Sequence, residues 1–209
     1  MARFYLIIPL ILLVLSGCSG LFPKPADPPM LWVLNPWQPQ PVEVAASANV
    51  QREEQKPLTW HLAIDLPSGG SSFDTSRVSI LRSPQIMEYL ARHEWADRVP
   101  MLLQGLLVKA FENSHRIIGV ARASAGINPD RLLMVDIRQF SVIKEATSYV
   151  HVALTVKLLD METRRIVQSS VFEHKQPLQT LEHKDILEAF QGAVNHVMDH
   201  IVDWTLATQ

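Results

Sequence analysis

Histidines gather near the C-terminus of this 209-residue chain, and their spacing raises the question of metal binding. Four of the eight histidines are His174, His183, His196 and His200. In "HVMDH" His196 and His200 are four residues apart, a spacing that puts two ligands on one face of a helix. A zincin helix has glutamate directly after its first histidine, whereas Val197 stands here, and no third ligand is indicated. We therefore interpret the pair as a solvated helix edge and predict no metal site.

Other residue patterns that carry catalysis are missing from the sequence. No serine stands in a Gly-x-Ser-x-Gly elbow, and "PSGGSS" has neither the lysine nor the following helix of a phosphate loop. The carboxylates Asp65, Asp74, Asp130 and Asp136 are spread over separate predicted strands and turns, which favours solvated edges and turn caps. We predict no catalytic residue, no cofactor and no cofactor-binding residue, and hence a protein that is not an enzyme.

Cys18 is the only cysteine, and its surroundings predict the covalent attachment of lipid. Residues 1–17 combine a positive start with an apolar run over 4–15, which is the pattern of an export signal. A run of about 12 apolar residues is too short for a bilayer core that needs about 20. "LSGC" at the end of this run resembles the bacterial lipobox, where a peptidase cuts just before an acylated cysteine. An ordinary secretory signal is the alternative, and a buried structural cysteine is disfavoured because the flanking sequence offers it no core.

The residue after the cysteine, Ser19, bears on localisation. Aspartate at this place typically signals inner-membrane retention in enterobacterial lipoproteins, so Ser19 favours the outer membrane. Several acyl chains hold a protein stably at a bilayer, because each buried CH₂ contributes about 0.8 kcal/mol. We expect an outer-membrane, lipid-anchored protein that faces the periplasm of a Gram-negative bacterium. Residues 18–29 then form a lipidated N-terminus and a proline-rich tether, in which 19–29 spans at most about 35 Å.

Length and charge limit the remaining possibilities. The chain suits one domain, which we place at residues 30–209. With 19 basic and 21 acidic residues and no dense basic cluster, nucleic acid is an unsuitable partner.

Periodicity in the domain predicts both strands and helices. "YVHVALTVKL" alternates apolar and polar residues as a half-buried strand does. Apolar residues at three- and four-residue spacing predict a helix after Asp97, its cap, with Pro100 in the first turn, and a second helix over 183–206. We expect Trp60, Trp95 and Trp204 in the core, whereas Trp32 and Trp37 flank the proline-rich region. The other expected strands are 30–36, 58–67, 77–83 and 86–95 as a hairpin, 116–122, 131–143 and 164–174.

These elements predict the fold class. An antiparallel or mixed sheet with two amphipathic helices packed on one face gives an α+β two-layer sandwich.

The order of these segments resembles a known family. The lipobox, "MLWVLNP", "DTSRVSILRS", "IMEYLARHEWADRVPMLLQGLLVKAF" and the terminal amphipathic helix are similar to the ABC-type transport auxiliary lipoprotein family, whose familiar members are the PqiC (YmbA) lipoproteins. The resemblance covers roughly residues 30–206. This sequence departs from it in the long polar loop 38–56 and in His93-Glu94 before the tryptophan. Its most specific residues, in order, are Asp74-Thr75-x-Arg77, Tyr89, Trp95-Ala96 and Pro100.

The resemblance implies a non-catalytic, periplasm-facing lipoprotein. It would work with an MCE-domain protein and inner-membrane transporter subunits in the traffic of phospholipid or other hydrophobic solutes. Its contacts would be the membrane, through acyl chains on Cys18, and these subunits, with homo-oligomerisation left open. We expect it to dock the assembly at the outer membrane. A binding module that carries a small apolar ligand between sheet and helices is the alternative.

Overall fold

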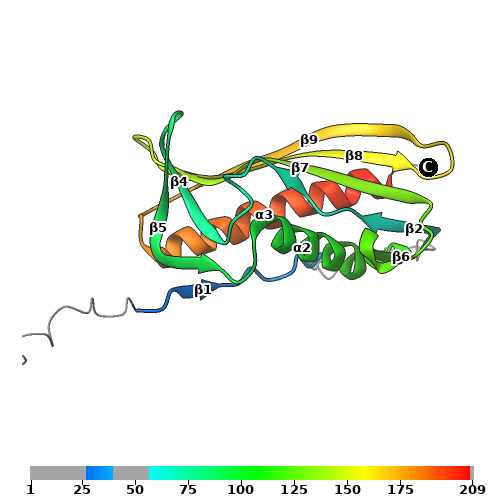
Figure 1. The fold of residues 1–209 in the computed structure, drawn as a ribbon, viewed down its shortest axis with the longest axis horizontal. Coiled ribbons are helices and arrows are strands. Elements are labelled where there is room, and N and C mark those ends of the chain that lie inside the picture. Colours follow the sequence, from blue (N-terminus) through cyan, green and yellow to red (C-terminus); the bar gives the residue numbers. More distant parts are fainter. Residues whose placement is uncertain (1–26, 40–56, 208–209) are drawn as a thin grey trace, which may run out of the picture.

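Three long antiparallel strands form the centre of the fold in the computed structural model, which describes residues 27–39 and 57–207 (Figure 1). β7 (Arg131–Ile143) pairs with β8 (Tyr149–Asp160), and β8 pairs with β9 (Arg165–Pro177). The predicted inward face of β8 is confirmed, because every second side chain from Val150 to Leu158 is fully buried, whereas Ala153 and Thr155 of the opposite face, expected outward, are buried as well. A turn joins β8 to β9, and in it the Asp160 carboxylate accepts hydrogen bonds from the backbone N–H and hydroxyl of Thr163.

Three short strands share the other edge of β7 in succession, and all run parallel to it. β2 (Leu58–Ile64), β3 (Ser68–Gly69) and β4 (Arg77–Ser83) pair with its start, middle and end. Farther out, β6 (Ile117–Arg122) runs parallel to β2, β5 (Ile86–Trp95) antiparallel to β4, and β1 (Met30–Trp32) parallel to β5. The result is an open, mixed sheet of nine strands within the described residues.

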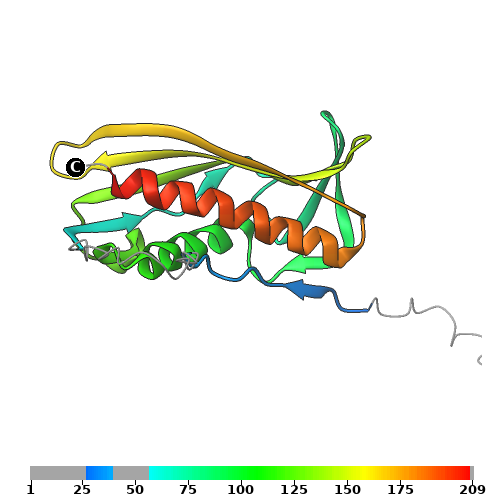
Figure 2. The same ribbon diagram turned by 180° about the vertical axis from the view of Figure 1, so that it is seen from behind.

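Two helices cover one face of this sheet (Figure 2). They are α2 (Val99–Ser114) and α3 (His183–Leu206), and a short 3₁₀ helix, η2 (Ala123–Ala125), lies between β6 and β7. Trp95, Phe140 and Phe190 meet at the centre of the core with ring centroids 5.0–5.6 Å apart. The predicted α+β arrangement of a mixed sheet with two helices is therefore confirmed, and Trp95 is a core residue as expected.

The start of α2 corrects one prediction. Asp97 does not cap the helix, because the cap residue is Arg98 and no side chain bonds the free N–H groups. The Val99 N–H instead donates to the Thr75 carbonyl at 3.0 Å. Pro100 lies in the first turn as predicted and has no N–H to satisfy. A distant backbone carbonyl thus replaces the expected side-chain cap.

Two predicted strands are shorter than expected. The first ends at Trp32 instead of residue 36, because only three residues pair with β5. The second ends at Ile64 instead of residue 67, and Leu66, beyond its end, is 52% exposed. The brief strand β3 follows and had no counterpart among the predictions.

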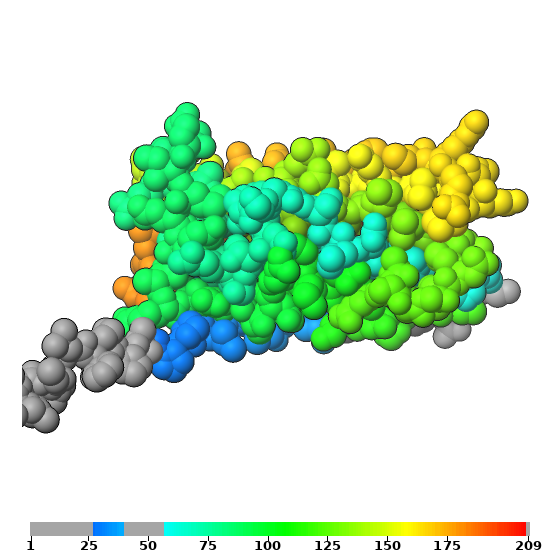
Figure 3. Space-filling view, in the orientation of Figure 1, coloured from blue at the N-terminus to red at the C-terminus, as the bar shows by residue number. Residues whose placement is uncertain are grey.

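The molecule is elongated, and its two ends carry different elements (Figures 1 and 3). β1 begins at one end, where the tip of the β4–β5 hairpin and the β7–β8 loop also lie. The β8–β9 turn and the last turn of α3 lie at the opposite end. Among the described residues, neither helix has the length and apolar content needed to cross a bilayer.

Candidate functional site

The segment Met30–Pro39 lies along the helices and is held at several points. Trp32 is 4% exposed and contacts the rings of Trp95 and His93, with centroids 5.7 and 5.1 Å away. On α3, the Gln191 side chain bonds Asn35 twice: its Oε1 accepts the Asn35 N–H at 2.7 Å, and its Nε2 donates to the Asn35 carbonyl at 3.0 Å. These contacts join the chain that leads toward Cys18 to the folded domain.

The tryptophans of this segment are core residues, which the sequence did not predict. Trp37 is 7% exposed, and its carbonyl accepts a hydrogen bond from Asn113 Nδ2 on α2 at 2.7 Å. Trp60 and Trp204, which we expected in the core, are only partly buried at its margin. We predicted that the tether ends at residue 29, and the burial of Trp32 and Trp37 shows that this segment packs on the rest of the fold.

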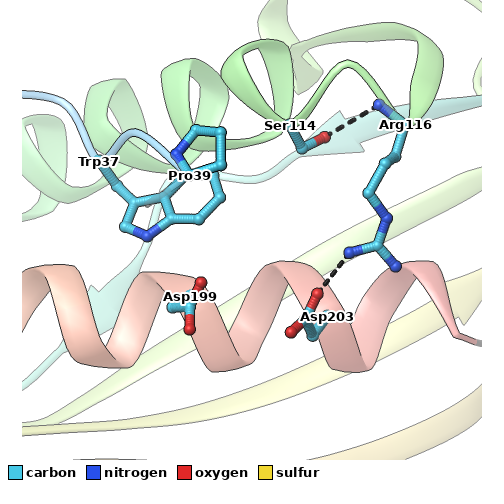
Figure 4. Close-up of a pocket in the computed structure, with 6 residues that line it drawn as sticks. All are labelled: Trp37, Pro39, Ser114, Arg116, Asp199 and Asp203. Carbon is cyan, nitrogen blue, oxygen red and sulfur yellow. Dashed lines mark hydrogen bonds and ion pairs between the residues drawn. The ribbon is translucent and has the colours of Figure 1, made fainter. Parts of the chain in front are cut away.

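A cleft of about 260 Å³ opens beside this segment, between α2 and α3 (Figure 4). Arg116 and Asp203 form an ion pair across it, and the Arg116 N–H donates to Ser114 Oγ at 3.3 Å. Asp199 lines this cleft together with Trp37 and Pro39. Its neighbours are thus an indole, a proline ring and a salt bridge.

A second cleft of about 460 Å³ shares Trp37 and Asp199 with the first. It contains two of three histidines that lie in a row: the ring of His196 is 4.1 Å from that of His174 and 4.3 Å from that of His200. His174 Nε2 bonds Gln176 Oε1 at 3.1 Å, and His200 Nδ1 bonds the His196 carbonyl at 2.8 Å. The structure therefore adds His174 of β9 to the helical pair that the sequence indicated.

The imidazoles of this row lie close enough for the charge of one to affect the protonation of the next. Burial, followed by the charges of His174 and His200, lowers the pKa of His196, while Asp199 acts to raise it. In the part of the chain that the structure describes, no group of three or more histidine, cysteine, aspartate or glutamate side chains is placed to hold a metal ion.

The four carboxylates considered for catalysis each have a local partner, so the structure does not bring them into one site. The His61 N–H donates to Asp130 Oδ2 at 2.7 Å and is the main cause that lowers the pKa of this carboxyl. Asp65 accepts the N–H of the next residue. Asp74 and Asp136 form ion pairs with Arg98 and Arg138. Cys18, the predicted lipid attachment site, lies outside the described residues.

Comparison with known families identifies the class of protein. The profile of the family described as "ABC-type transport auxiliary lipoprotein component" matches residues 42–202. The chain belongs to this family, as the order of its motifs indicated. The description of this family is that of an auxiliary lipoprotein of ABC-type transport, and a non-enzymatic role agrees with it.

Individual relatives confirm the fold. The crystal structure of protein XCC0632 from Xanthomonas campestris has a TM-score of 0.73 at 24% identity, covering 86% of this chain and 96% of that one. Hypothetical protein CT253 from Chlamydia trachomatis has a TM-score of 0.51 at 8% identity, covering 72% and 97%. The uncharacterized protein bll6063 of Bradyrhizobium diazoefficiens is 27% identical over 154 residues, which is 72% of this chain. The match spans about two fifths of that relative, 41% of its length.

Proposed function

We propose that this protein is a lipid-anchored, non-catalytic, periplasm-facing component of an MCE/ABC-type transport system for phospholipid or other hydrophobic solutes. In this proposal it docks the assembly at the outer membrane. Family membership supports the association with a transporter. The structural observation that supports the proposed docking is that the N-terminal segment is attached to one end of the domain, through β1 and Trp32.

The position of β1 sets the orientation of the domain relative to its membrane. If acyl chains are attached to Cys18, residues 19–29 allow at most about 35 Å between the membrane and β1. The end of the molecule that carries β1 and the β4–β5 hairpin is then close to the anchoring membrane (Figure 1). The β8–β9 turn lies at the far end and is available to a partner that reaches across the periplasm.

A photo-crosslinking experiment in membranes tests this orientation and the partner together. A photoreactive phenylalanine analogue replaces Glu162, exposed in the β8–β9 turn, or Gln85, exposed at the tip of the β4–β5 hairpin. We expect covalent products with an MCE-domain protein from position 162 and much less product from position 85. Products only from position 85 would reverse the orientation. Absence of MCE and transporter subunits from all products, and from material co-purified in detergent, would contradict the proposed partnership.

The alternative, an apolar ligand between sheet and helices, gains no support from the packing. Trp95, Phe140 and Phe190 fill the centre of this layer and contact one another. Each is at most 1% exposed, so a ligand at this place would have to displace core side chains.

A further inference from the structure

A cleft of about 360 Å³ lies on the side of the sheet that the helices leave uncovered. The tip of the β4–β5 hairpin, with Leu81 and Pro84, contributes to it from one side, and the β7–β8 loop, with Ile143 and Lys144, from the other. Gln139 and His151 on the adjoining strands complete it. Figures 1 and 2 both place the hairpin tip and the loop side by side, at the end of the molecule where β1 begins. This cleft is separate from the two clefts beside α3.

Two polar groups in the cleft have no partner in the described part of the chain. Gln139 Nε2 is buried without a hydrogen-bond acceptor. A buried donor left unpaired costs about 1–3 kcal/mol, so an acceptor supplied by a ligand would be stabilising. Lys144, exposed to solvent, has no described carboxylate within ion-pair distance. One anion in the cleft would accept the Gln139 hydrogen bond and pair with the Lys144 ammonium group.

The other charged groups of the cleft leave Lys144 as the available cation. Arg82 is paired with Glu88, and His151 Nε2 lies 3.1 Å from Glu173 Oε2. Glu145 also lines the cleft and is exposed to solvent as Lys144 is, so water screens both charges, and Gln139 Nε2 is the buried polar group of the cleft.

Apolar surface faces the same space. Leu81, Pro84, Ile143 and the ring of Tyr149 line the cleft together with the polar groups. A volume near the lower end of the usual range for ligand sites suits a head group with a short alkyl segment and excludes a complete lipid. Apolar walls beside an unpaired cation and an unpaired donor are the features that bind an anionic amphiphile.

We propose that this cleft binds the anionic head and first methylene groups of an amphiphile whose head is a carboxylate or a phosphate. The anion contacts Lys144 Nζ and accepts a hydrogen bond from Gln139 Nε2, and the methylene groups pack against Leu81, Pro84 and Ile143. A free fatty acid and a membrane phospholipid both have this chemistry. The proposal rests on the cleft itself and does not require the transport role proposed above.

Photolabelling of the full-length protein in nanodiscs of phosphatidylcholine tests the proposal. The three probes are diazirine-bearing decanoic acid, diazirine-bearing phosphatidylglycerol in the nanodisc, and diazirine-bearing decanol as an uncharged control. We expect mass spectrometry to locate the label of an anionic probe in residues 81–84 and 143–149. Labelling by decanoic acid assigns the site to a free carboxylate, and labelling by phosphatidylglycerol assigns it to a membrane phosphate.

Substitutions separate specific binding from adhesion to apolar surface. Lys144→Met removes the cation and should raise the half-saturating concentration of the anionic probe about tenfold, as expected for the loss of a charge-assisted hydrogen bond. Gln139→Leu removes only the donor and should weaken labelling less. Lys109→Met removes an exposed lysine of α2 and should leave labelling unchanged. Circular dichroism verifies that each variant is folded. The proposal is overturned if no anionic probe labels these segments, if decanol labels them equally, or if Lys144→Met labels like the unsubstituted protein.

Discussion

Replacing Trp32 with alanine tests whether the N-terminal segment is part of the folded domain. The side chain is 4% exposed and packs edge to face on Trp95. Trp→Ala in a core costs about 3–5 kcal/mol, through lost burial and the cavity that remains. Leu31 lies on the same strand but is 61% exposed, so Leu31→Ala is a matched control that should change stability by less than about 0.5 kcal/mol.

Urea unfolding followed by far-ultraviolet circular dichroism measures this loss, because the signal of α2 and α3 does not depend on the tryptophan that is removed. With a slope of about 2 kcal/mol per molar urea, Trp32→Ala should lower the midpoint by about 2 M. Leu31→Ala should leave it nearly unchanged.

Opening of β1 alone would give a different result. Only three residues of β1 pair with β5, so the strand could detach while the rest of the domain stays folded. The loss of stability in Trp32→Ala would then be no larger than the free energy with which β1 binds the domain. Release of the segment through Pro39 would lengthen the tether by about 10 residues, or about 33 Å. Equal midpoints for Trp32→Ala and Leu31→Ala would refute the attachment, and with it the orientation proposed for the domain.

Three further predictions concern the anchor, a turn and the histidine row. Cys18→Ala should abolish acylation and release or misprocess the protein while the fold of residues 30–206 is kept; unchanged membrane fractionation would contradict lipid attachment. Asp160→Ala should cost about 2 kcal/mol in urea unfolding, since this half-buried carboxylate pairs with Arg131 and also accepts two hydrogen bonds from Thr163; a loss below about 0.5 kcal/mol would show that the turn does not depend on it. The folded state lowers the pKa of His196, so the unfolded chain binds more protons below about pH 6.5, and stability falls as the solution becomes more acidic. His196→Gln should reduce this dependence in unfolding measured across that range, and an unchanged pH profile would count against the row as its source.

Local sequence patterns predicted the elements more accurately than their partners. The alternation in β8 and the apolar stripe of α3 are properties of consecutive residues, and α3 has the predicted bounds. The start of α2 was predicted within two residues of Val99. The Val99 N–H, however, donates to the carbonyl of Thr75, which lies 24 residues earlier and is not part of any helix-cap pattern. The strand predicted over 58–67 ends at Ile64, and after the Asp65 N–H bonds the Leu133 carbonyl of β7, pairing with β7 resumes only at β3.

The candidate sites were only partly predictable for the same reason. The four-residue spacing of His196 and His200 identifies them as a pair on one helix. His174 contacts His196 from β9, and nothing in the sequence around His174 indicates that contact. The cleft with Gln139 and Lys144 depends on how a hairpin and a loop from different parts of the chain meet. The spacing of residues in the sequence does not predict that contact.

The sequence by itself determined the two helices and the β8 strand, because each depends on neighbouring residues and on a fixed period, and it predicts the export signal and the lipobox at Cys18. Tertiary structure alone decided that Trp32 and Trp37 are core residues, that three short strands run parallel along β7, and that Asp65, Asp74, Asp130 and Asp136 have separate partners. The physical reason is that burial, strand pairing and ion pairing are interactions between distant segments, and a local pattern sets only which surfaces those segments can offer.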